Sequence, residues 1–234
     1  MTDKVLFVVT STDTLGDTGK GTGFHFSEMA DPYYVLTDAG FEVEIASTRG
    51  GAAPIDNEKS RGENPQSVER FLDDAAAMAK GRATTPVDEV HAEDYAGIYF
   101  PGGHGTMWDF PHHAALGRLV SRLFDAGKLV AAVCHGPAAF IGPTRADGEP
   151  LVKGKRVNSF SDAEERKVEL DGVVPFLLES KLRELGGKVE VAEAFQPIVV
   201  EDGNLITGQN PASAQPLAER MVAWLKEARA NGAA

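Results

Sequence analysis

Short apolar runs rich in β-branched residues recur along the chain, and helical patterns fill the intervals between them. Runs that predict strands cover residues 4–10, 41–47, 96–103, 128–136, 155–160 and 203–208. Apolar positions with helical spacing cover residues 27–39, 113–126, 172–186 and 211–230. Strands that alternate with helices predict an α/β fold with a parallel sheet covered on both faces. In such sheets, ligands gather at the carboxyl ends of the strands.

Residues 48–95 fit this alternation least well. They are rich in glycine, proline, asparagine and charge, with one helical pattern at 67–81. We expect a small insertion or lid beside the sheet in this region. A chain of 234 residues is long enough to bury one self-sufficient core, so we expect a single domain over residues 1–234.

The charge of the chain narrows the range of partners. The formal net charge is −12, from 23 basic and 35 acidic residues. Because no basic stripe is available to neutralise phosphates, we expect neither a nucleic-acid partner nor a membrane partner. No apolar stretch approaches the roughly 18 residues that a membrane span requires. The first residues also lack the basic and apolar regions of a secretory signal, so we expect a cytoplasmic location.

The only cysteine of the chain, Cys134, ends the apolar run KLVAAVC and precedes His135, Gly136 and Pro137. A free cysteine at the end of a buried strand is commonly an inert core residue. Alone it can form neither an internal disulfide nor a thiolate metal cage. The small residues and the proline that follow it are instead typical of a nucleophile elbow, a tight strand-to-helix turn that projects one side chain. Because the thiol would lie at the positive end of a helix, we expect its pKa to be lowered.

The histidines limit the kinds of cysteine site that the chain can build. All six lie at or before position 135. A glutamine-hydrolysing or papain-like site needs a histidine well downstream of its cysteine, so both are excluded. If the thiol has an imidazole partner, His135 is the best candidate, and an acidic residue must orient it. His112 and His113 are interpreted as surface residues at a helix start rather than metal ligands, because adjacent helical residues point in different directions.

Five segments together resemble a known family. They are AAVCHGPAAF, YFPGGHGTMWDFP, TGFHFSEMADPY, NSFSDAEE and ITGQNPASA. In combination they are similar to the ThiJ/PfpI superfamily, which has a class I glutamine-amidotransferase-like fold. Within it they resemble the branch of heat-shock chaperones that are also glutathione-independent glyoxalases (glyoxalase III). The resemblance implies a doubly wound, mostly parallel, flavodoxin-like sheet flanked by helices.

The resemblance also implies roles for individual residues. It places the nucleophile at Cys134 and its imidazole at His135. The acid of the triad falls in the segment FSDAEE, on Glu165 by register, with Asp162 as the alternative. Glu28 matches a second carboxylate that lies against the cysteine sulfur in this family.

Two adjacent glycines, Gly102 and Gly103, match the family's oxyanion hole. Their backbone N–H groups, with that of the residue after the cysteine, are expected to bind a substrate oxygen, since glycine lets a ligand approach bare backbone. Without the resemblance, the same glycines would predict only a turn. The resemblance further assigns pocket-lining or supporting positions to His104, Thr106, Trp108, His25 and Phe24.

The activity implied by the resemblance is the conversion of a 2-oxoaldehyde such as methylglyoxal to lactate, a lyase reaction of the D-lactate dehydratase class. The thiol adds to the aldehyde, a base (His135 or Glu28) moves the C1 proton to C2, and water cleaves the thioester. No cofactor is expected: neither glutathione, nor a metal, nor a nucleotide. The alternative is a stress-related holding chaperone for unfolded protein clients, or a redox sensor, with the same fold. A homodimer is expected in either case.

Overall fold

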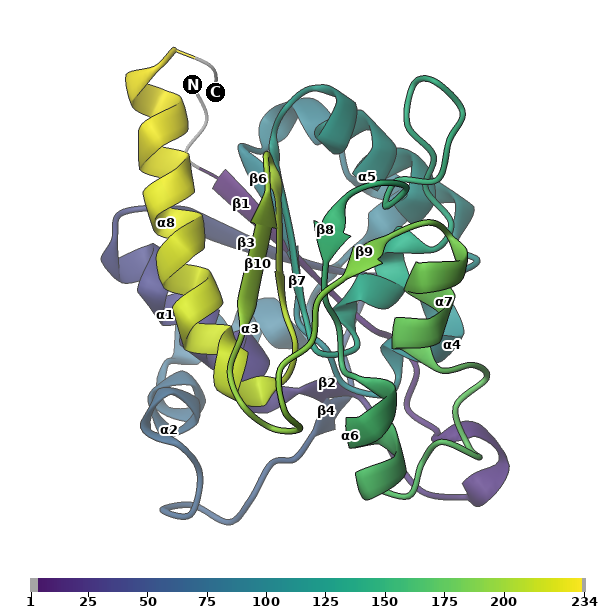
Figure 1. Ribbon diagram of the computed structural model, residues 1–234. Coiled ribbons are helices and arrows are strands. Elements are labelled where there is room, and N and C mark those ends of the chain that lie inside the picture. Colours follow the sequence, from purple (N-terminus) through teal and green to yellow (C-terminus); the bar gives the residue numbers. More distant parts are fainter. Residues whose placement is uncertain (1–3, 233–234) are drawn as a thin grey trace.

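The computed structural model describes residues 4–232 and is built around a seven-stranded sheet (Figure 1). Its strands lie in the order β10-β11-β7-β6-β1-β3-β5. Their bounds are β1 (Lys4–Val9), β3 (Glu42–Ser47), β5 (Thr85–Pro86), β6 (Gly97–Phe100), β7 (Leu129–Val133), β10 (Val199–Asp202) and β11 (Leu205–Gly208). Neighbouring strands are parallel except β10 and β11. The predicted mostly parallel sheet is therefore confirmed.

Helices cover both faces of this sheet (Figure 1). Their bounds are α1 (Phe26–Asp38), α2 (Gln66–Asp73), α3 (Ala75–Arg82), α4 (Thr106–Asp109), α5 (Ala114–Asp125), α6 (Asp162–Lys167), α7 (Leu178–Glu184) and α8 (Ala214–Ala230). Residues Val5, Phe7 and Val9 of β1 pack into a core shared with α1 and α8. Leu6 and Val8 pack into a second core shared with α5. Because both faces of the strand are buried, its sequence is continuously apolar rather than alternating.

The segment 48–95 is more closely tied to the sheet than its composition indicates. The helix expected at 67–81 is two helices, α2 and α3, because Asp74 ends one and begins the other. Its Oδ1 accepts hydrogen bonds from the N–H groups of Ala76 and Ala77, at 3.0 Å each, and so caps α3. The segment also supplies β5 to the main sheet, and its strand β4 (Ile55–Asp56) pairs with β2 (Phe24–His25).

Two further predictions are wrong in extent. The run at 155–160 forms only β8 (Arg156–Val157), which pairs with β9 (Lys188–Val189) outside the main sheet. The pattern at 172–186 is helical only in α7, since Pro175 lacks an N–H and disfavours helical geometry in the residue before it. The sequence patterns did not predict strand β10 or helix α6.

The carboxyl ends of β6 and β7 lie side by side, with Phe100 opposite Ala132. The segments that follow these strands therefore meet at one edge of the sheet, where a ligand site is expected. Between residues 4 and 232, no helix has the combination of length and apolar character that crossing a bilayer requires.

Candidate active site

Cys134 lies immediately after β7 in a sharp turn, as the elbow interpretation predicts. Its φ is +60°, a left-handed conformation that non-glycine residues adopt rarely and at an energetic cost. The backbone on both sides is fixed, because Cys134 N–H donates to Gly208 O (2.9 Å) and Phe160 N–H donates to Cys134 O (2.8 Å). The chain then enters a short 3₁₀ helix, Gly136–Phe140. A side chain at Gly136 would place its Cβ 2.2 Å from Phe100 O, so only glycine fits there.

The turn brings two consecutive side chains into contact. His135 Nδ1 lies 3.3 Å from Cys134 Sγ, and His135 Nε2 lies 2.6 Å from Glu165 Oε2. His135 and Glu165 are both buried. If Glu165 is ionised, it accepts the Nε2 proton, which leaves Nδ1 as an acceptor facing the thiol.

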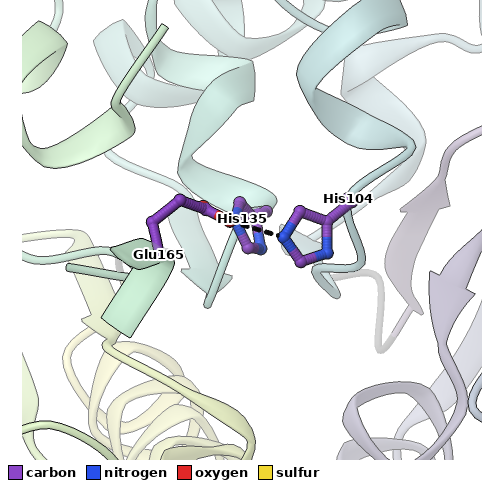
Figure 2. Close-up of side chains that lie close together, drawn as sticks. All are labelled: His104, His135 and Glu165. Atoms are coloured by element: carbon purple, nitrogen blue, oxygen red, sulfur yellow. Dashed lines mark hydrogen bonds and ion pairs between the residues drawn. The ribbon is translucent and has the colours of Figure 1, made fainter. Parts of the chain in front are cut away.

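Glu165 also holds a second imidazole. Its Oε1 lies 2.7 Å from His104 Nε2, and the two imidazole rings lie against each other with centroids 4.1 Å apart (Figure 2). Burial opposes ionisation of Glu165, but the hydrogen bonds from His104 and His135 outweigh it and lower its pKa to about 2. Burial, reinforced by His104, lowers the pKa of His135 to about 4. Near neutral pH the pair is therefore a carboxylate and a neutral imidazole.

The two candidate acids, Asp162 and Glu165, have different hydrogen-bond partners. Asp162 lies at the first turn of α6, where its carboxylate accepts hydrogen bonds from Ser180 N–H and Oγ–H. Glu165 lies one turn later and contacts His135. The start of α6 is set by a capping box between Ser161 and Glu164. This local cap fixes the helix so that the third residue after Asp162 reaches the imidazole.

Glu28 lies in the first turn of α1, fully buried. Its Oε2 accepts the Gly102 N–H at 2.7 Å, while its Oε1 has no hydrogen-bond partner within the described part of the chain. Burial raises the pKa of Glu28 to about 8, although hydrogen bonds from Cys134 and Gly102 oppose this. Near neutral pH this carboxyl group therefore keeps its proton.

Two expectations about this part of the site are wrong. Burial and the charge of Glu28 raise the pKa of the Cys134 thiol well above its ordinary value, so the predicted lowering is not found. The five-residue 3₁₀ helix after it is too short to offset these effects. The Gly102 amide donates to Glu28 and is not free for a substrate oxygen. The amides of Gly103 and His135 remain as candidates for that role, with the His135 amide also hydrogen-bonded to Cys134.

Only glycine fits at position 103. Its φ is +103°, and a Cβ there would lie 2.2 Å from Gly23 O. The turn that contains it is held by Thr106, whose hydroxyl contacts Gly103 O (2.9 Å) and His135 O (3.0 Å). Thr106 therefore has the supporting position that was expected of it.

A cavity of about 390 Å³ opens over Cys134. The residues that line it are Leu15, Lys20, Gly21, Thr22, His25, Asp56, Asn57, Gly103, His104, Cys134, His135, Phe160, Val168, Leu170, Phe195 and Pro211. His25 lines the cavity as expected, and burial lowers its pKa to about 4. Trp108 and Phe24 are not among these residues; Phe24 packs edge-on against Phe26.

Several cavity residues could not be identified from the sequence. Asp56 and Asn57 come from the 48–95 segment, so part of that segment does border the site. Phe195 lies in the loop VAEAFQP, and its φ of +65° is unusual for a bulky residue. No pattern in the sequence marked Phe195 as a cavity residue.

The histidines differ in their capacity to bind a metal. The donor atoms of His104, His135 and Glu165 lie within 4.8 Å of one another, a separation that a metal ion could bridge. His113 is not a plain surface residue: its Nδ1 accepts the Leu116 N–H and its Nε2–H donates to Thr48 O, so it caps α5. With both ring nitrogens engaged, His113 cannot bind a metal without breaking this cap.

Comparisons with known proteins agree with this geometry. The model of the DJ-1/PfpI family matches residues 20–223. The chain is 32% identical to the glutathione-independent glyoxalase HSP31 of Saccharomyces cerevisiae over 95% of this chain and 98% of that protein. It is 30% identical to glyoxalase 3 of Candida albicans over 94% and 97% of the two chains.

Solved structures agree as well. The 24 kDa rapid encystment protein of Francisella tularensis has a TM-score of 0.91 and 37% identity, over 96% of this chain and 99% of that one. Glyoxalase III of Candida albicans has a TM-score of 0.85 and 29% identity, over 94% and 96%. The resemblance found in the sequence motifs is confirmed.

Proposed function

Because the chain belongs to the DJ-1/PfpI family, we propose that it is a glutathione-independent glyoxalase that converts methylglyoxal and related 2-oxoaldehydes to 2-hydroxy acids. The observation that carries this proposal is the series Cys134 Sγ, His135 and Glu165, joined at 3.3 Å and 2.6 Å beside an open cavity. The similarity to two proteins named as glyoxalases supports the same activity.

The first step is addition of the Cys134 thiol to the aldehyde carbon. His135 Nδ1, 3.3 Å from Sγ, accepts the thiol proton as the carbon–sulfur bond forms. Because its pKa is raised, the Cys134 thiol is protonated near neutral pH, and its deprotonation by His135 accompanies the attack on the aldehyde. The imidazolium returns its proton to the substrate oxygen, and the amides of Gly103 and His135 are the proposed donors that stabilise that oxygen before protonation.

The second step moves a proton within the substrate. Glu28 keeps its own proton near neutral pH, so His135, neutral again, is the better base for the C1 proton. Transfer of that proton to C2 through an enediol oxidises C1 and reduces C2, giving a thioester of Cys134. Water then cleaves the thioester to lactate and regenerates the thiol. Methylglyoxal plus water gives lactate with no external oxidant or reductant, as a lyase of the D-lactate dehydratase class requires.

The alternative of a holding chaperone requires apolar surface for unfolded clients. Among the described residues, the large hydrophobic side chains that are exposed are Val168, Val191 and Phe195. Two of these three line the cavity beside Cys134. This distribution favours a small-molecule site over a client surface.

The proposal is tested by measuring lactate formed from methylglyoxal without added glutathione. We expect the unmodified protein to form one enantiomer of lactate and Cys134→Ala to form none above background. Circular dichroism of the variant checks that it is folded, since the thiol is buried. A Cys134→Ala protein that keeps most of the activity would overturn the mechanism, and absence of lactate from the unmodified protein would overturn the function.

A further inference from the structure

The cavity over Cys134 is much larger than methylglyoxal needs. At about 390 Å³ it has room for about a dozen waters at roughly 30 Å³ each. It falls within the range of about 300–1,000 Å³ that is typical of sites for drug-sized ligands. Methylglyoxal has only five non-hydrogen atoms. An aldehyde of that size bound at the thiol would leave most of the cavity to water.

The exposed part of the cavity lining includes two large apolar side chains, Val168 and Phe195, beside the polar residues Lys20 and Asn57. Its inner end holds Cys134 and His135, which are 4% and 1% exposed. Towards solvent, the wall includes Val168 and Phe195, which are 39% and 46% exposed. These two and Val191 are the exposed large hydrophobic side chains of residues 4–232. Exposed apolar side chains that gather at a cavity mark a place where an apolar ligand group binds.

Phe195 is held at the cavity at an energetic cost. Its φ of +65° is strained for a bulky side chain, and its N–H donates to Glu164 Oε1 at 2.7 Å. Glu164 is a fully buried carboxylate that also accepts hydrogen bonds from Asn210 Nδ2 (2.8 Å) and from Ser161. A buried, fully hydrogen-bonded acceptor thus keeps the loop in a conformation that presents this ring.

The ring of Phe195 continues a series of rings that leads to the nucleophile. Its centroid lies 6.3 Å from that of Phe160, and the Phe160 centroid lies 4.6 Å from that of His135. A planar apolar group attached to a reacting carbonyl would meet ring faces and edges along this wall.

We infer that the preferred substrates are 2-oxoaldehydes with a bulky apolar substituent, aromatic above all, whose aldehyde binds at Cys134 while the substituent packs against Phe160, Val168 and Phe195. This inference rests on the proposed function and names its substrate class. The chemistry is unchanged: phenylglyoxal plus water gives mandelate, with C1 oxidised and C2 reduced by the same internal proton transfer.

The test compares kcat/KM for phenylglyoxal and methylglyoxal in the unmodified protein, Phe195→Ala and Phe195→Tyr. Mandelate and lactate are measured as products, because phenylglyoxal also reacts with arginine side chains. Val191→Ala is the matched control, since Val191 is 42% exposed and does not line the cavity. Thermal unfolding of each variant checks its fold.

We expect the unmodified protein to prefer phenylglyoxal by roughly 10–100-fold, the range that added apolar contacts provide. Phe195→Ala should lower that preference about tenfold by losing phenylglyoxal turnover selectively. Phe195→Tyr and Val191→Ala should retain it. Equal kcat/KM values for the two aldehydes in the unmodified protein, or an equal fall of both values in Phe195→Ala, would overturn this inference and leave the proposed function standing. Failure to form acid from either aldehyde would instead overturn the proposed function.

Discussion

At the scale of single residues, the site depends on how one carboxylate serves two imidazoles. Glu165 lies 2.6 Å from His135 and 2.7 Å from His104, so it fixes which ring nitrogen of each carries a proton. His135 can accept the thiol proton only while its Nδ1 is unprotonated. Glu165 is therefore a positioning residue that acts through His135.

Replacing Glu165 by Gln should lower kcat by at least roughly 100-fold with little change in KM, because the amide no longer holds His135 in the required tautomer. Steady-state kinetics with methylglyoxal measures this. The control is Asp162→Asn, three residues earlier on α6, where the side chain contacts Ser180 and not the imidazole. Asp162→Asn should stay within about twofold of the unmodified protein. A smaller effect of Glu165→Gln than of Asp162→Asn would show that the wrong acid has been assigned.

The sequence motifs predicted Cys134 and His135 as partners and left the acid open between Glu165 and Asp162; the structure brings Cys134, His135 and Glu165 into contact. The motifs were not enough for Gly102, whose amide is taken by a carboxylate from α1. That contact joins residues 74 positions apart, and no local pattern encodes it. The prediction of a lowered thiol pKa was wrong for the same reason. Burial and Glu28 raise that pKa, and neither is visible in the sequence of the elbow.

At the scale of elements, residue Asp74 divides a helical pattern in two. Its Oδ1 accepts the N–H groups of Ala76 and Ala77, which would otherwise lack partners at the start of α3. The apolar spacing of 67–81 continues through this break, so periodicity alone predicted one helix. The capping residue was the signal that should have separated α2 from α3.

Asp74→Ala should lower the free energy of unfolding by about 1 kcal/mol, within the usual range of about 0.5–2 kcal/mol for loss of an N-cap. Urea unfolding measures the change. Asp73→Ala is the control, because that neighbouring side chain is 77% exposed and pairs with Arg61 at the surface. Equal effects of the two substitutions would argue against the cap. Methylglyoxal turnover should be unaffected by either.

At the scale of the whole molecule, the order of strands places the site. The segments after β6 and β7 meet because these strands are neighbours in the sheet. Alternating patterns were sufficient to predict a parallel sheet with two covered faces, but not the strand order. They also missed β10, whose half-buried residues lie at the antiparallel edge of the sheet.

Burial of Glu28 links the stability of the whole protein to pH. Its folded-state pKa of about 8 is above the ordinary value of 4.5. The stability that its proton gives to the folded protein is therefore fully present below pH 4.5 and is lost as pH rises through about 8. Glu28→Gln removes this titration while keeping an acceptor for Gly102. The free energy of unfolding of the variant, relative to the unmodified protein, should rise by roughly 3–5 kcal/mol between pH 4.5 and 8. Denaturant titrations across this pH range measure it, and a flat difference would contradict a buried neutral carboxyl.

In the proposed mechanism, the sulfur of Cys134 forms the bond to the aldehyde carbon of the substrate. Rapid acid quenching during methylglyoxal turnover, followed by peptide mapping with mass spectrometry, detects this bond. We expect one substrate-derived adduct on the peptide that contains Cys134, present during turnover and gone when the substrate is exhausted. Turnover with no adduct on Cys134, or with the transient adduct on another residue, would contradict the proposed mechanism.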